Sequence, residues 1–147
     1  MEPRFDAIQE FLEKDGRDSD VALTLLTDFL GELVELFCGH PSIARNHKLI
    51  MRELLSPSAA FDILYEKIVD REFEVISRLI MAITGDPDER KATYQAFLLM
   101  GQIIMFRQGR EAIVRRLGLH GYDALEIREI RQLITEWAGK VLEKDSR

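Results

Sequence analysis

Four prolines constrain the fold of this chain more than any other feature, because each stands where a helix can begin but cannot continue. Proline fits the first turn of a helix and not its interior. Ser56-Pro57 and Asp86-Pro87 each pair a capping residue with proline at the first helical position. The other two prolines are Pro3 and Pro41, and glycines stand where the intervening helices would end, at Gly16, Gly39, Gly85 and Gly118.

These proline and glycine positions divide the chain into helices joined by short turns. They predict helices over 3–14, 19–38, 41–55, 57–84, 87–117 and 122–144, the fifth weakened near Gly109. We find no alternation of apolar and polar residues typical of strands, and no internal repeat. The predicted fold class is therefore all-α, a bundle of about six helices in one domain that spans residues 1–147.

Composition narrows the function classes. The chain is 46% hydrophobic and 31% charged, with a formal net charge of −6, which is typical of globular proteins. It has no basic run, so it is a poor nucleic-acid binder by itself. The longest apolar stretch, 96–106, is about half of what a membrane-spanning helix needs. The single cysteine, Cys38, excludes an internal disulfide and suits a reducing compartment. We expect a cytoplasmic protein without a membrane partner.

The sequence carries no constellation typical of catalysis or metal binding. Its histidines, His40, His47 and His120, stand in no H-E-x-x-H or E-x-x-H arrangement. No glycine-rich phosphate loop follows a strand. We therefore predict no catalytic residues, no metal site and no cofactor, and we do not expect an enzyme.

The two C-terminal helices carry more apolar surface than one neighbour can cover. Segment 91–108 is apolar around nearly its whole circumference, and Gly101 would allow close approach on the side of Phe97 and Ile104. These stripes are either the interior core of a monomer or an interface with a second copy of the chain. The interface hypothesis assigns to it Phe97, Gly101 and Ile104, together with the heptad-like stripe Ile127, Ile130, Ile134, Trp137 and Val141.

Three polar side chains are set among apolar ones. His47 shares a helical face with Ile50 and Met51, while Tyr65 and Glu72 lie on the apolar face of helix 57–84. A buried carboxylate requires a partner or takes up a proton. Either each group is paired locally, or they converge on a ligand pocket. The pocket hypothesis predicts a mainly apolar, aromatic or weakly cationic guest lined by His47, Met51, Tyr65, Glu72, Phe29 and Met105.

The chain resembles the C-terminal domain of TetR-like bacterial transcriptional regulators. The resemblance is carried by HPSIARNHKLIMRELLSPSAAFDILYE (40–66), LLMGQIIMFRQGREAIVRRLG (98–118) and YDALEIREIRQLI (122–134), and it covers about residues 5–143. It implies that helix 3–14 is the remnant of a connecting helix, that 19–84 encloses an effector pocket, and that 87–144 forms a four-helix dimer bundle. It further implies a homodimeric sensor, acting as a repressor, that reaches operator DNA through an N-terminal helix-turn-helix headpiece. This sequence has no counterpart of that headpiece, so we expect a trimmed chain.

Two other functions are compatible with the same residues. The chain could be a stand-alone helical dimerisation module with no small-molecule role, in which case no compound would stabilise it against unfolding. It could also be a small helical enzyme or carrier, which would require a bound cofactor or metal for which the sequence supplies no ligands.

Overall fold

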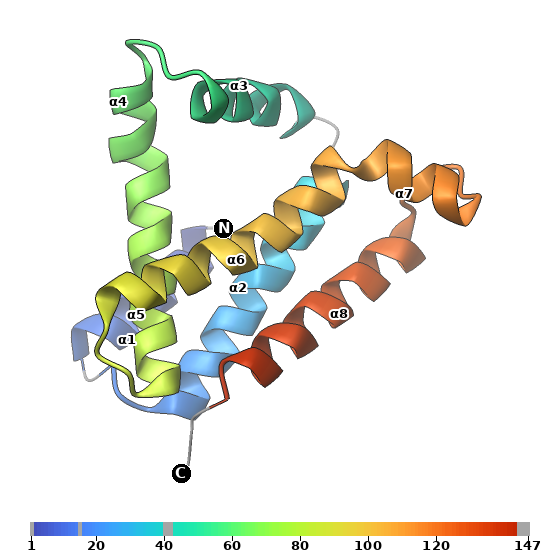
Figure 1. The fold of residues 1–147 in the computed structure, drawn as a ribbon. Coiled ribbons are helices and arrows are strands. Elements are labelled where there is room, and N and C mark those ends of the chain that lie inside the picture. The colour runs from blue at the N-terminus through green and yellow to red at the C-terminus, as the bar shows by residue number, and fades with distance from the viewer. Residues whose placement is uncertain (1, 15, 40–42, 144–147) are drawn as a thin grey trace.

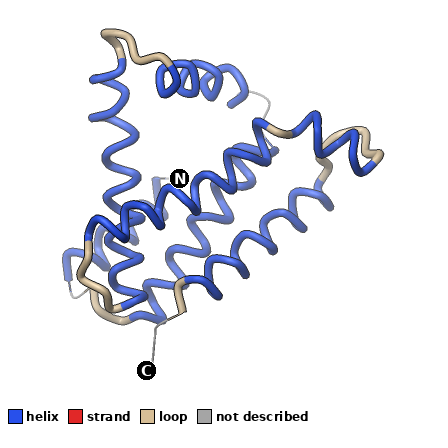
Figure 2. The backbone as a smooth tube through the Cα atoms, viewed as in Figure 1, coloured by secondary structure: helices blue, strands red, loops and turns tan. Residues whose placement is uncertain are grey.

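The computed structural model describes residues 2–14, 16–39 and 43–143, and every regular element in these ranges is helical (Figures 1 and 2). The all-α prediction is confirmed. The elements are α1 (Glu2–Lys14), α2 (Ser19–Gly39), α3 (Ile43–Leu55), α4 (Phe61–Leu64), the π-helical turn η1 (Tyr65–Val69), α5 (Asp70–Thr84), α6 (Glu89–Gln108), α7 (Arg110–Leu117) and α8 (Ala124–Val141).

Helix α2 occupies the centre of the molecule. It packs against α5, α6 and α8, and its side chains Leu26, Phe29, Leu30 and Val34 are fully buried. Burial against three helices explains why α2 is rich in apolar residues outside one polar stripe that includes Asp20, Thr24 and Glu35. Helix α6 is instead buried on one side only, through Ala92, Ala96, Leu99, Met100 and Ile103.

A glycine allows α2 and α8 to approach closely. The Arg131 side chain of α8 lies over Gly31, where an added Cβ would stand only 2.5 Å from Arg131 Nε. From there the guanidinium reaches the Glu35 carboxylate, one turn further along α2. The Arg131–Glu35 salt bridge therefore fixes the position of α8 along α2 beside the apolar core.

The helix predicted from Pro57 begins later, at Phe61. The carboxylate of buried Glu53 accepts hydrogen bonds from the Ser58 backbone N–H at 2.9 Å and from its hydroxyl at 2.8 Å. These bonds hold 56–60 in a turn outside the helix, so Pro57 belongs to the loop and not to the first helical turn.

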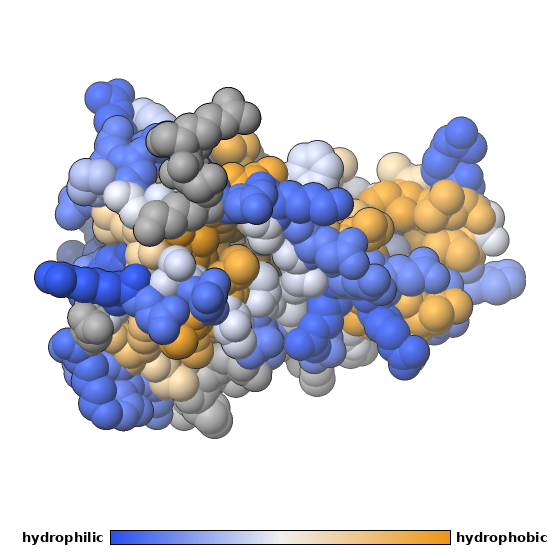
Figure 3. All heavy atoms as spheres, turned by 90° about the horizontal axis from the view of Figure 1, so that it is seen from below, coloured by the Kyte–Doolittle hydropathy of each residue, from blue (hydrophilic) through white to orange (hydrophobic). Residues whose placement is uncertain are grey.

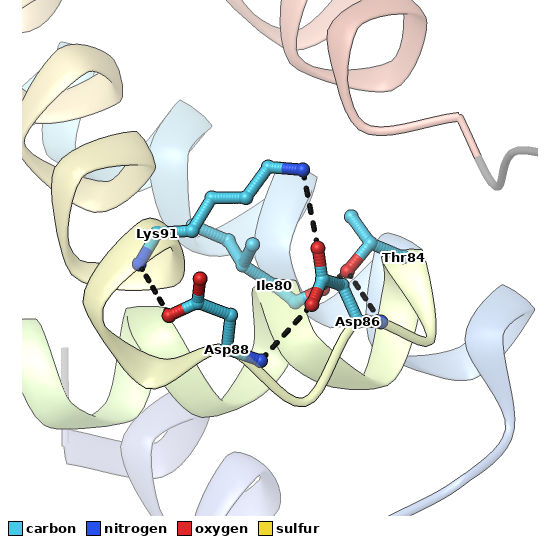
Figure 4. Close-up of polar contacts among 5 residues, drawn as sticks. All are labelled: Ile80, Thr84, Asp86, Asp88 and Lys91. Carbon is cyan, nitrogen blue, oxygen red and sulfur yellow. Dashed lines mark hydrogen bonds and ion pairs between the residues drawn. The ribbon is translucent and has the colours of Figure 1, made fainter.

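The turn between α5 and α6 also shifts a predicted boundary (Figure 4). Asp88, and not Asp86, caps α6, because its carboxylate accepts from the Lys91 backbone N–H at 3.1 Å. Asp86 accepts from the Asp88 backbone N–H at 3.0 Å and pairs with Lys91 Nζ at 3.1 Å, and these donors lower the pKa of Asp86. Gly85, with φ of 74°, ends α5 as predicted.

The weakness predicted at Gly109 is a break between α6 and α7. The Tyr122 hydroxyl donates to the Phe106 carbonyl at 2.9 Å, and the Arg110 guanidinium lies over the Tyr122 ring. These contacts fold α7 back toward the start of α8, where Asp123 and Glu126 form a capping box.

Two glycine substitutions test the backbone assignments. Gly139→Ala lies inside α8, where an added Cβ meets nothing within 4 Å, and we expect it to stabilise the fold by about 0.5–1 kcal/mol. Gly85→Ala forces alanine into the left-handed region and should cost about 1–2 kcal/mol. Urea unfolding of both variants measures the difference. A Gly139→Ala variant less stable than the wild type would contradict the open environment of Gly139.

Candidate functional site

A cavity of about 490 Å³ lies between α3 and the framework formed by α2, the α4–η1–α5 segment and α6. Its volume is in the range of small-molecule sites in proteins. The described part of the lining is apolar except for one residue, and consists of Leu36, Phe37, Leu49, Ile50, Met51, Leu54, Leu64, Ile68, Val69, Glu72, Phe73, Phe97, Met100, Gly101 and Ile104.

Helix α3 forms one wall of the cavity and lies across the open end between α4–α5 and α6 (Figure 1). The cavity is not closed to solvent, because Leu49 is 58% exposed and Leu54 and Ile68 are each 40% exposed. Removing apolar side chains of this size from water lowers the free energy of the system. The site would therefore be stabilised by an apolar guest that covers them.

Among the described residues that line the cavity, Glu72 is the single ionisable one. Burial of its carboxyl group raises its pKa, and no cationic side chain of the described residues opposes that shift. The sequence prediction that Glu72 points toward the interior agrees with this position, and Met51 lines the same cavity. The side chain of His47 lies outside the described part of the structure.

The predicted place of Tyr65 in the cavity is wrong, because the helix does not keep α-helical spacing before Glu72. Residues Tyr65–Val69 form the π-turn η1, which closes i→i+5 and holds about one residue more than an α-turn. Side chains that precede it are rotated away from the expected face. Tyr65 is 43% exposed, and its hydroxyl donates to the Asp70 carboxylate at 3.4 Å.

Two further residues of the predicted lining lie elsewhere. Phe29 is fully buried in the core on α2, because only the C-terminal part of α2, with Leu36 and Phe37, reaches the cavity. Met105 is 60% exposed on α6, on the side away from the core. Sequence reasoning missed both Phe73, which it did not single out, and Phe97, which it assigned to the interface.

A stacked pair of rings separates the cavity from a second groove. Phe73 of α5 and Phe97 of α6 stack with centroids 3.9 Å apart and an angle of 17° between their planes, and both line the cavity and the groove. The groove is more polar, and its charged lining residues are Asp70, Glu74, Arg78 and Glu89. The stack therefore divides an apolar compartment from an acidic one.

The residues predicted for the dimer interface separate into three groups. Ile130 and Ile134 are buried, and Ile127 is partly buried against the same core, so these three pack within the monomer and the prediction for them is corrected. The stripe faces α2, which packs along α8 and covers these side chains. Phe97, Gly101 and Ile104 line the cavity, whereas Trp137 and Val141 are exposed.

An exposed apolar surface does exist on α6 and α8, and it includes Trp137 and Val141 of the predicted interface together with positions that the interface prediction did not select. On α6, Tyr94, Leu98 and Met105 recur at intervals of four and seven residues, on the side opposite the core. On α8, exposed Leu133 precedes Trp137 and Val141 at intervals of four. We call these six residues the α6–α8 apolar face. On the side of the molecule drawn in Figure 3, apolar side chains also reach the surface in separate patches between charged ones.

Other chemical groups do not form a site in the described residues. Burial raises the pKa of the Cys38 thiol to about 11, which keeps it protonated and unreactive at neutral pH. Among the described residues no group of three His, Cys, Asp or Glu side chains is placed to hold a metal ion. Nor is any helix in those ranges long and apolar enough to cross a membrane.

Comparison with known proteins identifies the family. Residues 22–143 match the family described as the C-terminal domain of the HTH-type transcriptional dual regulator CecR. The chain belongs to this family. It is also 35% identical, over 89 residues, to the HTH-type transcriptional dual regulator CecR of Shigella flexneri. That alignment covers 60% of this chain and 40% of the relative, so the chain spans well under two thirds of the protein it matches.

The range that matches the CecR C-terminal family includes the candidate site as well as the core. The matched range includes every residue that lines the cavity and all of the α6–α8 apolar face. The coarse prediction of a regulator domain is thereby confirmed.

The raised pKa of Glu72 makes a prediction for stability. Its pKa in the folded chain lies above the ordinary value of 4.5, so the native state binds the proton more tightly than the unfolded state, and stability declines as pH rises through the folded pKa. Glu72→Gln removes this penalty. We expect a higher melting temperature than wild type at about pH 8, by roughly 2–4 °C for each kcal/mol gained, and a smaller gain at about pH 5.

The control is Glu66→Gln, which removes the same charge from an exposed position outside the cavity. Scanning calorimetry at both pH values should show little effect of this variant. A gain for Glu72→Gln that is equal at the two pH values would contradict the desolvation of Glu72.

Proposed function

We propose that this chain is the effector-sensing and homodimerisation domain of a TetR-like transcriptional repressor. The observation that carries the proposal is the open apolar cavity beneath α3, in a chain that belongs to a family of regulator C-terminal domains. A cavity lined by residues from six elements offers a guest a large apolar surface. Its single carboxyl group provides orientation.

The position of α3 supports a role in signalling. The described residues of this helix pack against α2 and α4, and its apolar side chains Leu49 and Leu54 remain about half exposed. A guest that contacts them would favour one placement of α3 over others, because a ligand shifts an equilibrium only by its differential affinity for the two states. In the proposed regulator, such a shift would change the spacing of two DNA-binding headpieces and release the operator.

The α6–α8 apolar face supports the dimer. Large apolar side chains such as Leu98, Leu133 and Trp137 are each more than half exposed, and apolar surface that gathers on adjacent helices marks an interface. Helices α6 and α8 contact each other and run in opposite directions across the molecule (Figure 1). Two copies related by a two-fold axis would form a four-helix interface with the same residues on both sides.

The alternative proposal, a dimerisation module without a small-molecule role, shares the α6–α8 apolar face but assigns nothing to the cavity. Binding of an apolar probe therefore distinguishes the two. A catalytic function would require reactive groups in the cavity, and its described lining offers one carboxyl group alone.

The neutral fluorescent probe N-phenyl-1-naphthylamine tests the cavity. We expect saturable binding to the wild-type chain, measured by fluorescence titration, and at least tenfold weaker binding to Ile68→Trp, in which the indole occupies space in the cavity. The matched control is Ile63→Trp, the same substitution at a more exposed isoleucine on α4 that does not line the cavity. Equal binding to both variants, or no binding to the wild type, would overturn the sensing role and favour the interaction module.

Sedimentation velocity tests the dimer. The wild-type chain should sediment at twice its mass of 17.0 kDa, and Leu98→Glu or Leu133→Glu should shift it toward the monomer, because each places a charge in the proposed interface. Leu55→Glu changes a more exposed leucine, on α3, and should leave the dimer intact. A monomeric wild type, or dimers of both interface variants, would refute this assignment.

A further inference from the structure

We propose that the guest of this cavity is a lipophilic cation, a mostly apolar molecule with one positively charged group, and that Glu72 is its counter-ion. The inference rests on the proposed sensing role and specifies the class of molecule sensed. It follows from three observations: the isolation of Glu72, the aromatic rings around it and the charge of the neighbouring groove.

Glu72 has no partner of opposite charge in the described part of the chain. The basic residue next to it, Arg71, places its guanidinium over the Phe5 ring, 4.3 Å from the centroid. On α6, Arg107 directs Nη1 to the Phe37 carbonyl at 3.4 Å. On α3, Lys48 and Arg52 are exposed and do not line the cavity.

A carboxylate in apolar surroundings either takes up a proton or is paired with a cation. Pairing in a medium of low polarity is stronger than in water. A guest that brings its own positive charge would therefore relieve the cost of the ionised group. An anionic guest would add a second negative charge beside it.

Three phenylalanines line the same cavity, Phe37, Phe73 and Phe97. The face of an aromatic ring attracts a cation within about 6 Å of its centroid. Rings and a carboxylate together form a site for a positive group embedded in an apolar body. The same rings offer an anion no comparable attraction.

The groove on the other side of the Phe73–Phe97 stack would also attract cations more strongly than anions. Its lining includes three carboxylates, Asp70, Glu74 and Glu89, against one guanidinium, Arg78. The chain as a whole has a formal net charge of −6. A field of this sign raises the local concentration of cations near the cavity and lowers that of anions.

Three probes of similar shape and different charge test the proposal. They are tetraphenylphosphonium, the neutral triphenylphosphine oxide and the anion tetraphenylborate. Affinities are measured by displacement of N-phenyl-1-naphthylamine and directly by titration calorimetry. We expect the cation to bind at least tenfold more tightly than the neutral probe, and the anion to bind most weakly.

Substitution of the counter-ion separates its effect from the general charge of the protein. Glu72→Gln keeps the shape of the side chain and removes the charge, and we expect the preference for the cation to fall to within threefold of the neutral probe. Glu66→Gln removes one negative charge from an exposed position outside the cavity. It should retain the tenfold preference.

The failure of this inference is distinct from the failure of the sensing role. If the naphthylamine and the neutral probe bind but the cation has no advantage, or if Glu72→Gln keeps the full preference, the cavity is a binding site for neutral guests and the inference is wrong. If the naphthylamine and all three probes fail to bind, both the sensing role and this inference are wrong.

Discussion

The rest of the structure depends on the burial of α2 by α5, α6 and α8. Because Leu26, Phe29, Leu30 and Val34 are covered on several sides, α2 takes the central position that only one helix of a small bundle can hold. The helices around it then have one buried side each. Helix α6 buries its alanines against the core and leaves Tyr94, Leu98 and Met105 outside. The exposed apolar surface of α6 therefore follows from its place at the outside of the bundle as well as from its composition.

The cavity follows from the same arrangement. Helix α3 is amphipathic, yet the core is already filled where α2 meets α5 and α6, so α3 covers only the outer ends of these helices. The segment that follows α3 is kept outside the helix by the hydrogen bonds that Ser58 donates to the Glu53 carboxylate. Below it, the Phe73–Phe97 stack fixes the separation of α5 and α6. Apolar side chains thus face a space that no part of the described chain fills.

Much of this arrangement could be predicted from the sequence. Proline and glycine punctuation located the helices, since the backbone preferences involved act within a few residues. The errors arose where a local rule gave way to a specific contact. Constant helical spacing placed Tyr65 beside Glu72, but η1 inserts extra rotation between them. A heptad-like stripe selected Ile130 and Ile134 for a partner, but core and interface require the same residue types. Trp137 belongs to the same predicted stripe and is exposed, whereas exposed Leu133 was not selected. Buried and exposed positions could be told apart only once α2 was known to cover the other side of α8.

Glu72 links stability to the proposed function. Burial of its carboxyl group raises its pKa, so in the empty protein the ionised form is disfavoured and the fold is less stable than an apolar residue would make it. That cost is useful in a sensor, because a guest that neutralises the charge contributes more to the bound state than its apolar contacts alone. Since α3 supplies part of the same lining, this additional free energy acts on a helix whose described residues pack against α2 and α4. Under the proposed function, the residue that weakens the empty domain is thus the one that couples recognition of the guest to a change in α3.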